Sequence, residues 1–400
     1  MEKLASKKIV IVGGGAAAMI AAAQLSSDYE VHIYEQGKTL GRKFLVAGKG
    51  GFNLTNQATG AALYQQYSDL PALQQALQQF DSTTMRSWLQ ELGVETYVGS
   101  SGRVFPLEGT KPIQVLQAIR NHLIAKGVQL HYQHTWKGFD EQQQLLMDTK
   151  EGRITVAADS YIFALGGASW PVTGSNQEWL VHFEQLGIAT QPFQASNCGI
   201  EIPWPESFKA KFAGQPLKNI AVQVGAMRLK GEALITDYGL EGNVIYPLVA
   251  ALRPLLQEQG KAEFLLDLKP FSSVENLQKK ALSPTFSPKK YASTFKLQKA
   301  ALALAKLYTS KEIYLEPTAF SLALKDLKIT THSLRPLQEA ISTVGGISSQ
   351  AIKNDFSLQQ NPTIFVIGEM LDWDAPTGGF LLQGCFSTAS ACAHYLNQQL

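Results

Sequence analysis

Residues 8–18 read KIVIVGGGAAA, and their pattern predicts how the fold begins. The β-branched run at 9–12 predicts a buried strand, and the three glycines that follow predict a tight turn. The alanine-rich segment 16–25 then continues as a helix. A strand, a glycine turn and a helix in this order predict the first unit of a parallel, doubly wound α/β sheet.

The glycines have the G-x-G-x-x-A spacing of a dinucleotide-binding turn. Gly13 permits the turn, Gly15 lets the backbone approach a pyrophosphate, and Ala18 keeps the helix close to the strand. The amides of Ala16 and Ala17 lie at the positive end of the helix dipole, where they can bind phosphate oxygens. This turn therefore predicts a nucleotide cradle.

A second strand is predicted over 30–34, and Glu35 stands at its end, 20 residues after Gly15. An acid at that place binds the hydroxyls of an adenosine ribose, and it disfavours a 2′-phosphate. Gln36 follows directly and is included in the predicted cofactor site.

Residues 41–56, GRKFLVAGKGGFNLTN, predict a loop where a simple NAD dehydrogenase would continue with a helix. The segment has four glycines, three cations and two amides. It can wrap an anion and offer backbone N–H groups to a polar ring. The predicted ligands in it are Arg42, Lys43, Gly50 and Asn53.

This loop resembles the signature of the BaiN-like (YhiN-type) family of NAD(P)/FAD-dependent flavoproteins, which belong to the two-dinucleotide-binding-domain superfamily. Three further stretches are similar to motifs of that family. They are GRVFP at 102–106, ALGGAS at 164–169 with TGS at 173–175, and GEMLD at 368–372 with GGF at 378–380. The motifs span nearly the whole chain.

The chain also departs from the family pattern. Gly51 and Phe52 stand where the family has Arg and Cys, Asp237 replaces a customary His, and Leu381 replaces an Asn. The chain therefore resembles a divergent branch of the family. In such a branch the family's cofactor-binding residues can be assigned to this sequence more readily than its substrate and catalytic residues.

The resemblance implies non-covalently bound FAD. In the superfamily a strand that ends near Trp136 holds adenine through its backbone, and a Gly-acid pair binds the ribityl or pyrophosphate region. The glycine pair before a helix that begins near Gln383 would hold the O2/N1 edge of the flavin. The residues implied in these roles are Trp136, Ala164, Gly166, Gly368, Glu369, Asp372, Gly378, Gly379 and Phe380.

Near residue 190 prolines become frequent and short β runs appear, and amphipathic helices are predicted at 273–282 and 293–308. We predict a discontinuous FAD-binding domain at 1–190 and 340–400. An inserted β-rich, substrate-side domain with a small helical subdomain would occupy 191–339. The resemblance implies the same division of a Rossmann-like fold of the glutathione-reductase type.

Composition narrows the classes of function. Thirty-five basic against 33 acidic side chains give a net charge of +2, which excludes a strongly basic nucleic-acid binder as the default. Cys198, Cys385 and Cys392 are too scattered for a disulfide framework or a redox dithiol, and seven histidines show no metal spacing. The apolar stretch 9–23 is shorter than the about 20 residues that span a membrane. We expect a cytoplasmic protein with no metal and no membrane partner.

The implied activity is that of an FAD-dependent oxidoreductase. It would reduce a conjugated C=C bond of a small molecule or nucleobase with NADH or NADPH as electron donor. The alternatives are reduction of uridine to dihydrouridine in ribosomal RNA, oxidation of an aminoacetone-type amine, and flavin binding without catalysis. Candidate catalytic groups are Asp237, Tyr238 and Trp373, with Tyr238 as a proton donor. The RNA alternative requires a basic face on the insert, and a solvated surface is the simpler explanation of the basic residues there. These residues are Lys209, Lys211, Lys218, Arg228, Lys230, Lys289, Lys290 and Lys296. The sequence leaves the oligomeric state open.

Overall fold

The structure, a computed structural model, describes residues 6–46, 51–282 and 287–400. The chain divides into two compact units, Met1–Gln194 with Ser342–Leu400, and Ala195–Ile341. Each unit has its own hydrophobic core. We describe the units separately, and refer to them as the first and the second unit.

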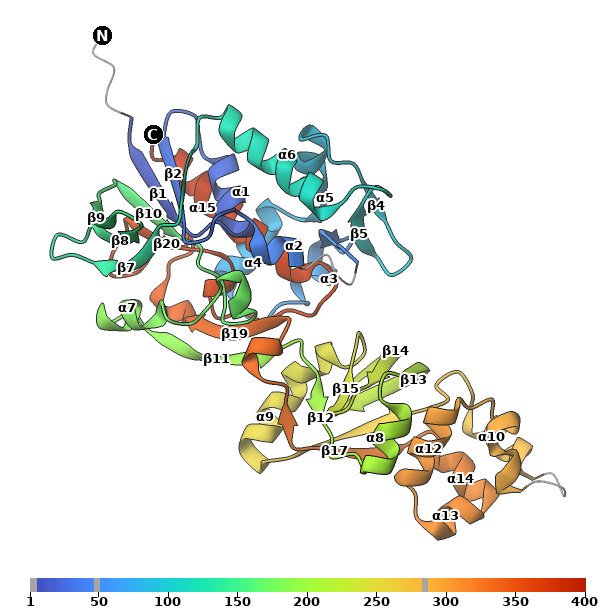
Figure 1. Ribbon diagram of the computed structural model, residues 1–400. Coiled ribbons are helices and arrows are strands. Elements are labelled where there is room, and N and C mark those ends of the chain that lie inside the picture. The colour runs from blue at the N-terminus through green and yellow to red at the C-terminus, as the bar shows by residue number, and fades with distance from the viewer. Residues whose placement is uncertain (1–5, 47–50, 283–286) are drawn as a thin grey trace. The chain divides into compact units, whose positions relative to one another are not determined.

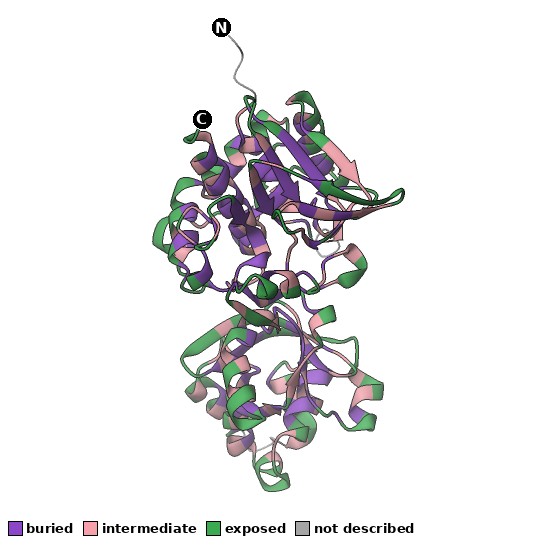
Figure 2. Ribbon diagram, turned by 90° about the vertical axis from the view of Figure 1, so that its left-hand side faces the viewer, coloured by how far each residue is buried: buried purple, intermediate pink, exposed green. Residues whose placement is uncertain are grey.

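A five-stranded parallel sheet forms the centre of the first unit (Figure 1), with strand order β20-β10-β1-β2-β6. Its strands are β1 (Lys8–Val12), β2 (Glu30–Glu35), β6 (Gln129–Tyr132), β10 (Ser160–Phe163) and β20 (Ile364–Val366). The β-branched run of β1 lies between two neighbouring strands and is almost completely buried, as Figure 2 shows for the middle of this sheet. The predicted α/β class is confirmed.

Helices α1, α6 and α15 pack together beside this sheet (Figure 1). Small side chains over Ala17–Ala23 let α1 approach the strands and α15 closely. The helices of the unit are α1 (Ala16–Gln24), α2 (Arg42–Val46), α3 (Gly60–Tyr64), α4 (Pro71–Gln79), α5 (Ser82–Glu91), α6 (Pro112–Ala125), α7 (Leu180–Gln185) and α15 (Phe380–Asn397).

Smaller sheets complete the first unit. An antiparallel meander of β7 (Thr135–Phe139), β8 (Leu145–Thr149) and β9 (Gly152–Val156) packs on β10, because the rings of Trp136 and Phe139 lie 4.7 and 5.7 Å from that of Phe163. A second small sheet has the order β3 (Thr55–Asn56), β5 (Arg103–Pro106), β4 (Thr96–Val98). A two-stranded sheet pairs β11 (Thr190–Ser196) with β19 (Ser342–Ile347).

The second unit contains a seven-stranded antiparallel sheet of order β17-β16-β13-β14-β15-β12-β18. The strands are β12 (Ile200–Glu201), β13 (Pro216–Val224), β14 (Met227–Ile235), β15 (Gly239–Glu241), β16 (Ala262–Asp267), β17 (Leu327–Thr331) and β18 (Ser333–Leu334). Its helices are α8 (Glu206–Phe212), α9 (Val249–Gln259), α10 (Val274–Ala281), α11 (Tyr291–Thr294), α12 (Lys299–Leu307), α13 (Lys311–Leu315) and α14 (Pro317–Ala323).

Three sequence predictions need correction in the first unit. The predicted loop 41–56 contains the helix α2, because Phe44 turns into the core and packs edge-on against Phe52, with ring centroids 4.9 Å apart. The last helix begins at Phe380 rather than near Gln383, directly after Gly379 in the left-handed region. Trp136 lies near the start of β7 and not at the end of a strand.

One predicted helix of the second unit is also wrong. The segment predicted as a single helix over 293–308 is divided into α11 and α12. Lys296 adopts a left-handed conformation with φ 49°, which a continuous α-helix of L-residues does not accommodate.

No helix within the described part of the chain has the length and apolar character needed to cross a membrane.

Candidate functional site

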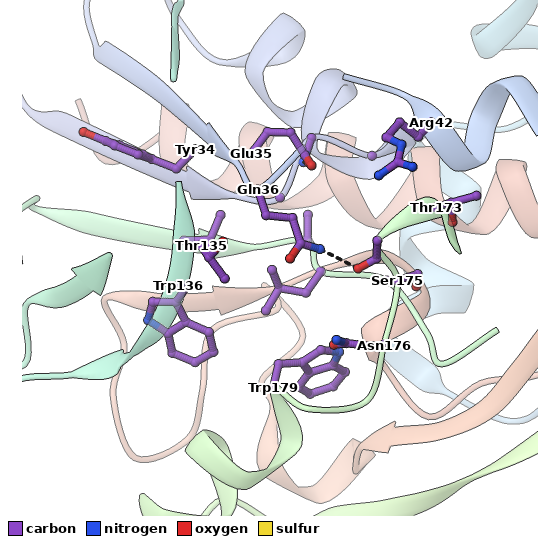
Figure 3. A pocket seen from close by; sticks show the side chains of 18 of the residues that line it. Tyr34, Glu35, Gln36, Arg42, Thr135, Trp136, Thr173, Ser175, Asn176 and Trp179 are labelled. Carbon is purple, nitrogen blue, oxygen red and sulfur yellow. Dashed lines mark hydrogen bonds between the residues drawn. The ribbon is translucent and has the colours of Figure 1, made fainter. Parts of the chain in front are cut away.

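A pocket opens in the first unit beside the carboxyl ends of β1, β2 and β10 (Figure 3). This is the edge of a parallel sheet at which nucleotides bind. The pocket is lined by nine of the residues predicted for the cofactor, namely Gly13, Gly15, Glu35, Gln36, Arg42, Lys43, Trp136, Ala164 and Gly166. Segments far apart in the sequence therefore converge on one site.

Glycine is present at positions 13 and 15 of the first turn for two different reasons. Gly13 has φ 104°, and a β-carbon there would lie 2.5 Å from the carbonyl oxygen of Ala164, so the fold itself requires glycine. Gly15 has φ −79°, and no atom within 4 Å would meet its β-carbon. A side chain at position 15 would point into open space in the pocket wall, which is the space that a bound group would fill.

The positive end of α1 faces the same place. The helix begins directly after Gly15, no side chain caps it, and its first turn carries no acid. Free amides and the helix dipole therefore favour an anion there. The methyl group of Ala17 packs against the C-terminal motif, because a β-carbon at Gly368 would lie 2.9 Å from it. The predicted role of the Ala17 amide toward the cofactor stays a prediction.

Glu35 lies at the end of β2 in the pocket wall. Its carboxylate accepts hydrogen bonds from the backbone N–H groups of Gly14 (2.7 Å) and Gly37 (2.5 Å). Burial raises the pKa of Glu35, and these two hydrogen bonds and the nearby Arg42 guanidinium oppose that rise. The carboxylate is thus held in place at the position predicted for a ribose acid.

The opposite wall comes from the loop before α7 and from β7. Gln36 donates a hydrogen bond from Nε2 to the carbonyl of Gly174 (2.5 Å), and Arg42 donates to the carbonyl of Val172 (2.7 Å). Both bonds join the acid-bearing segment to the loop of residues 172–176 across the site, and Figure 3 marks the one from Gln36. The indole of Trp136 lines the pocket beside Trp179. Flat rings at this end suit a planar base.

Lys43 connects this pocket to the C-terminal motif. Its ammonium group lies 2.8 Å from the carboxylate of Glu369 and 2.9 Å from the hydroxyl of Ser169. The other carboxylate oxygen of Glu369 accepts from the N–H of Thr343 at 3.2 Å. Glu369 lies in the short 3-10 turn Gly368–Met370, next to the pocket-lining Lys43.

The predicted flavin-edge residues form a second group. Gly378 and Gly379 have φ 114° and 101°, and a β-carbon at Gly379 would lie 2.2 Å from the backbone of Thr55. Asn56 donates to the carbonyl of Gly378 at 3.2 Å. A β-carbon at Gly378 would lie 3.4 Å from Nε of Arg103, so the guanidinium group is beside the glycine pair.

Other predicted cofactor residues are placed outside the pocket lining. Asp372 accepts a hydrogen bond from the N–H of Gly345 at 3.0 Å, and Phe380 is buried in the core. Asn53 is half-buried just before β3. Ala16 packs against the core, and Gly50 lies outside the described residues. Their roles toward the flavin stay predictions.

The three catalytic candidates are divided between the units, with Trp373 in the first and Asp237 and Tyr238 in the second. Trp373 is 2% exposed, and its indole N–H donates to the carbonyl of Gly368 at 2.8 Å, so it supports the turn that carries Glu369. Asp237 is exposed in the second unit. Tyr238 donates its hydroxyl to Glu241, and burial together with that carboxylate raises the pKa of the phenol.

Several pocket residues were not predicted from the sequence: Tyr34, Thr39, His134, Thr135, Asn176, Trp179 and His182. One signal was present, because Trp179 and His182 are three residues apart and so share a face at the start of α7. The described residues hold no group of three His, Cys, Asp or Glu side chains that could bind a metal ion.

The donor set fits the ADP part of FAD. An unfilled space at Gly15, an uncapped helix N-terminus and a half-buried acid are the parts that pyrophosphate and ribose require. Lys43 lines the pocket and pairs with Glu369, so the site continues toward the C-terminal motif, which favours a longer dinucleotide than ADP alone.

Comparison with known proteins agrees with this geometry. The family model described as HI0933-like protein Rossmann domain matches residues 7–395. The chain is 24% identical over 399 residues to a ribosomal RNA dihydrouridine synthase of Haemophilus influenzae, covering 94% of this chain and 95% of that protein. It is 23% identical over 385 residues to a 3-dehydro-bile acid delta(4,6)-reductase of Clostridium scindens, covering 92% and 93%.

Among solved structures, the chain is similar to 3-ketosteroid-delta4-(5alpha)-dehydrogenase from Rhodococcus jostii RHA1 in complex with 4-androstene-3,17-dione. The TM-score is 0.51 and the identity 11%, with 98% of each chain covered. At that identity the likeness shows a shared fold.

Proposed function

This chain belongs to the HI0933-like Rossmann domain family and is an FAD-dependent oxidoreductase; on that premise we propose that it reduces a conjugated C=C bond, with NADH or NADPH as the electron donor. The bile-acid reductase relative supports this reaction class by its name. Bound FAD would supply hydride chemistry, while the protein supplies binding, orientation and electrostatics.

In this proposal the pocket holds the adenosine and pyrophosphate. Glu35 accepts from the ribose hydroxyls, the N-terminus of α1 binds the pyrophosphate, and Lys43 adds a positive charge to the site. The ion pair between Lys43 and Glu369 would hold the turn Gly368–Met370 in position when FAD binds in the pocket. The backbone N–H groups at Gly378 and Gly379 would hold the polar edge of the flavin ring.

One observation carries the choice of a conjugated substrate. Arg103 lies beside Gly378 and is half-buried, and no carboxylate among the described residues pairs with its guanidinium. When hydride adds to the β-carbon of an unsaturated carbonyl compound, negative charge develops on the carbonyl oxygen. A guanidinium beside the carbonyl oxygen would stabilise that charge. The α-carbon then takes a proton from water.

The test is an anaerobic titration of the purified protein. FAD should co-purify, and NADH or NADPH should bleach its absorbance. An added steroid enone, such as 4-androstene-3,17-dione, should restore the absorbance. An Arg103→Ala variant should retain FAD and its reduction but slow reoxidation by the enone about 100-fold, near 2.7 kcal/mol of barrier. A colourless protein without affinity for FAD would refute the proposal, and an unchanged Arg103→Ala variant would refute the assigned role.

A second candidate is reduction of uridine in RNA, whose C5=C6 bond is conjugated to a carbonyl. It is favoured by the name of the Haemophilus relative and by a cationic, aromatic surface on the second unit. Uridine-containing RNA incubated with reduced enzyme should gain two hydrogen atoms per converted base by mass spectrometry. RNA of unchanged mass, with active enone reduction, would reject this candidate alone.

A further inference from the structure

A large aromatic side chain is exposed on the second unit. Phe271 follows β16 and is 73% exposed. The ammonium group of Lys230, on β14, lies 5.2 Å from the centroid of its ring. Isolated exposed apolar residues are common, but an exposed ring beside a lysine offers both a stacking face and a charge.

The segment that carries Phe271 is held in a fixed shape. The ammonium group of Lys325 donates to the carbonyls of Lys269 (2.8 Å) and Ser272 (3.0 Å), on either side of the phenylalanine. Lys325 also pairs at 2.7 Å with Asp267, which is 1% exposed. The N–H of Lys269 donates to the same carboxylate at 2.8 Å. Phe271 is therefore presented by a braced turn.

Further cations lie around this turn. Burial lowers the pKa of Lys269, and the positive charges of Lys280 and Lys296 lower it further. Lys269 donates to the carbonyl of Lys296 at 3.3 Å. Lys230, Lys280 and Lys296 are exposed. We call Lys230, Lys269, Phe271, Lys280 and Lys296 the Phe271 surface.

Carboxylates nearby do not neutralise these lysines. Asp267 is already paired with Lys325 and with Arg228, whose nitrogen lies 2.5 Å away. The remaining acids on the elements that form the turn are Glu232 on β14, Glu263 on β16 and Glu275 in the first turn of α10. None of these three forms an ion pair with a lysine of the Phe271 surface. The surface keeps a local excess of positive charge although the whole chain is nearly neutral.

We propose that the Phe271 surface binds a single-stranded or loop segment of RNA, with a base stacked on the ring and phosphates on the lysines. This inference rests on the second candidate function above. Single-stranded nucleic acids are held by this combination, because every base has a flat face and every linkage a charge. A duplex fits poorly, since its bases are stacked on each other and not available to Phe271.

The experiment measures fluorescence anisotropy of a fluorescein-labelled, mixed-sequence single-stranded RNA of about 16 nucleotides with the full-length, FAD-loaded protein. Phe271→Ala should weaken binding about tenfold, and Phe271→Trp should retain it, because stacking is preserved. Lys230→Gln with Lys280→Gln should weaken binding and reduce the slope of log affinity against log salt by about 0.7 per lost phosphate contact.

Lys306→Gln is the matched control. Lys306 also lies over an aromatic ring, that of Tyr314 at 5.4 Å, but belongs to α12 and not to the Phe271 surface. It should leave RNA binding within twofold of wild type. Equal binding by Phe271→Ala and wild type, or equal affinity for a duplex of the same length, would overturn the inference.

Flavin reduction and enone turnover are measured on the same samples. Phe271 lies in the second unit, and the pocket predicted to hold FAD is lined by residues of the first unit, so Phe271→Ala should keep flavin reduction and enone turnover. Lost RNA binding with normal flavin chemistry in Phe271→Ala is the expected result. If Phe271→Ala binds RNA as wild type does and its flavin chemistry is normal, this inference alone is refuted. If the protein binds no FAD, the proposed function is refuted.

Discussion

Gly13 and Gly15 are identical in the sequence, but the structure shows different roles for them. Gly13 serves the fold, because its φ of 104° and the nearby Ala164 carbonyl exclude a β-carbon. Gly15 has ordinary backbone angles and open space beyond its α-carbon. Only a bound group gives a reason for glycine at position 15.

A Gly15→Val variant should therefore fold with a melting temperature close to that of the flavin-free wild type and bind little FAD. Its side chain would occupy the space for the pyrophosphate without striking protein atoms. Gly13→Val is the control that should lose stability instead. Flavin occupancy and thermal unfolding, measured on both variants, separate the two effects. Wild-type flavin occupancy in Gly15→Val would show that the cradle lies elsewhere.

The contribution of Glu35 to the stability of the flavin-free protein should decrease as pH rises. In the unfolded chain its pKa is near 4.5, and burial raises it in the fold. The folded state thus binds the proton more tightly, and stability falls as pH rises from about 4.5 through the raised pKa. In Glu35→Gln this part of the pH dependence should disappear, while FAD binding weakens by about 1–3 kcal/mol. Melting curves of the flavin-free proteins between pH 4 and 7 provide the measurement, and identical slopes would contradict it.

The ion pair of Lys43 with Glu369 joins two elements, α2 and the turn before α15. Its exposed fractions are 29% and 14%, so each charge depends partly on the other for solvation. Lys43→Met and Glu369→Gln should each destabilise the flavin-free protein, and the double variant should cost less than their sum. A coupling energy of about 0.5–3 kcal/mol from urea unfolding is expected. Additive effects would mean that the pair does not fix the turn.

The elements of the parallel sheet could be predicted because their signals are local. The run at 9–12, the glycine turn and the acid at Glu35 each lie within one strand or turn, and pocket geometry follows from parallel strands sharing one edge. Helix α2 could not be predicted in this way. Its glycine-rich surroundings indicate a loop, and only the tertiary contact of Phe44 with Phe52 shows why residues 42–46 form a helix.

The wall made by Trp179 and His182 shows a second limit. These residues reach the pocket because α7 lies beside β7, where His182 contacts Trp136 with ring centroids 4.9 Å apart. Nothing in the sequence of a six-residue helix specifies that neighbour. Likewise, the braced turn at Phe271 depends on Lys325, which is 54 residues away along the chain.

The cysteines are distributed over both units, and only Cys385 lies near predicted cofactor residues, against the turn that carries Gly368 and Glu369. All three are free, Cys198 and Cys392 are buried, and Cys385 is half-buried. Burial raises the pKa of Cys385 to about 12 and raises that of Cys392 as well. A thiol with so high a pKa supplies almost no thiolate near neutral pH, and the thiolate is the nucleophile in disulfide exchange.

A variant with all three cysteines replaced by serine should therefore keep flavin reduction and substrate turnover within about threefold, apart from lost stability. Hydride would pass without a thiol relay, so removing sulfur leaves the proposed chemistry intact. Stopped-flow bleaching of the flavin and steady-state turnover test this, and a triple Cys→Ala variant controls for burying hydroxyl groups. A fall of about 100-fold, or about 2.7 kcal/mol of barrier, in variants that fold and hold FAD would place a thiol in the mechanism.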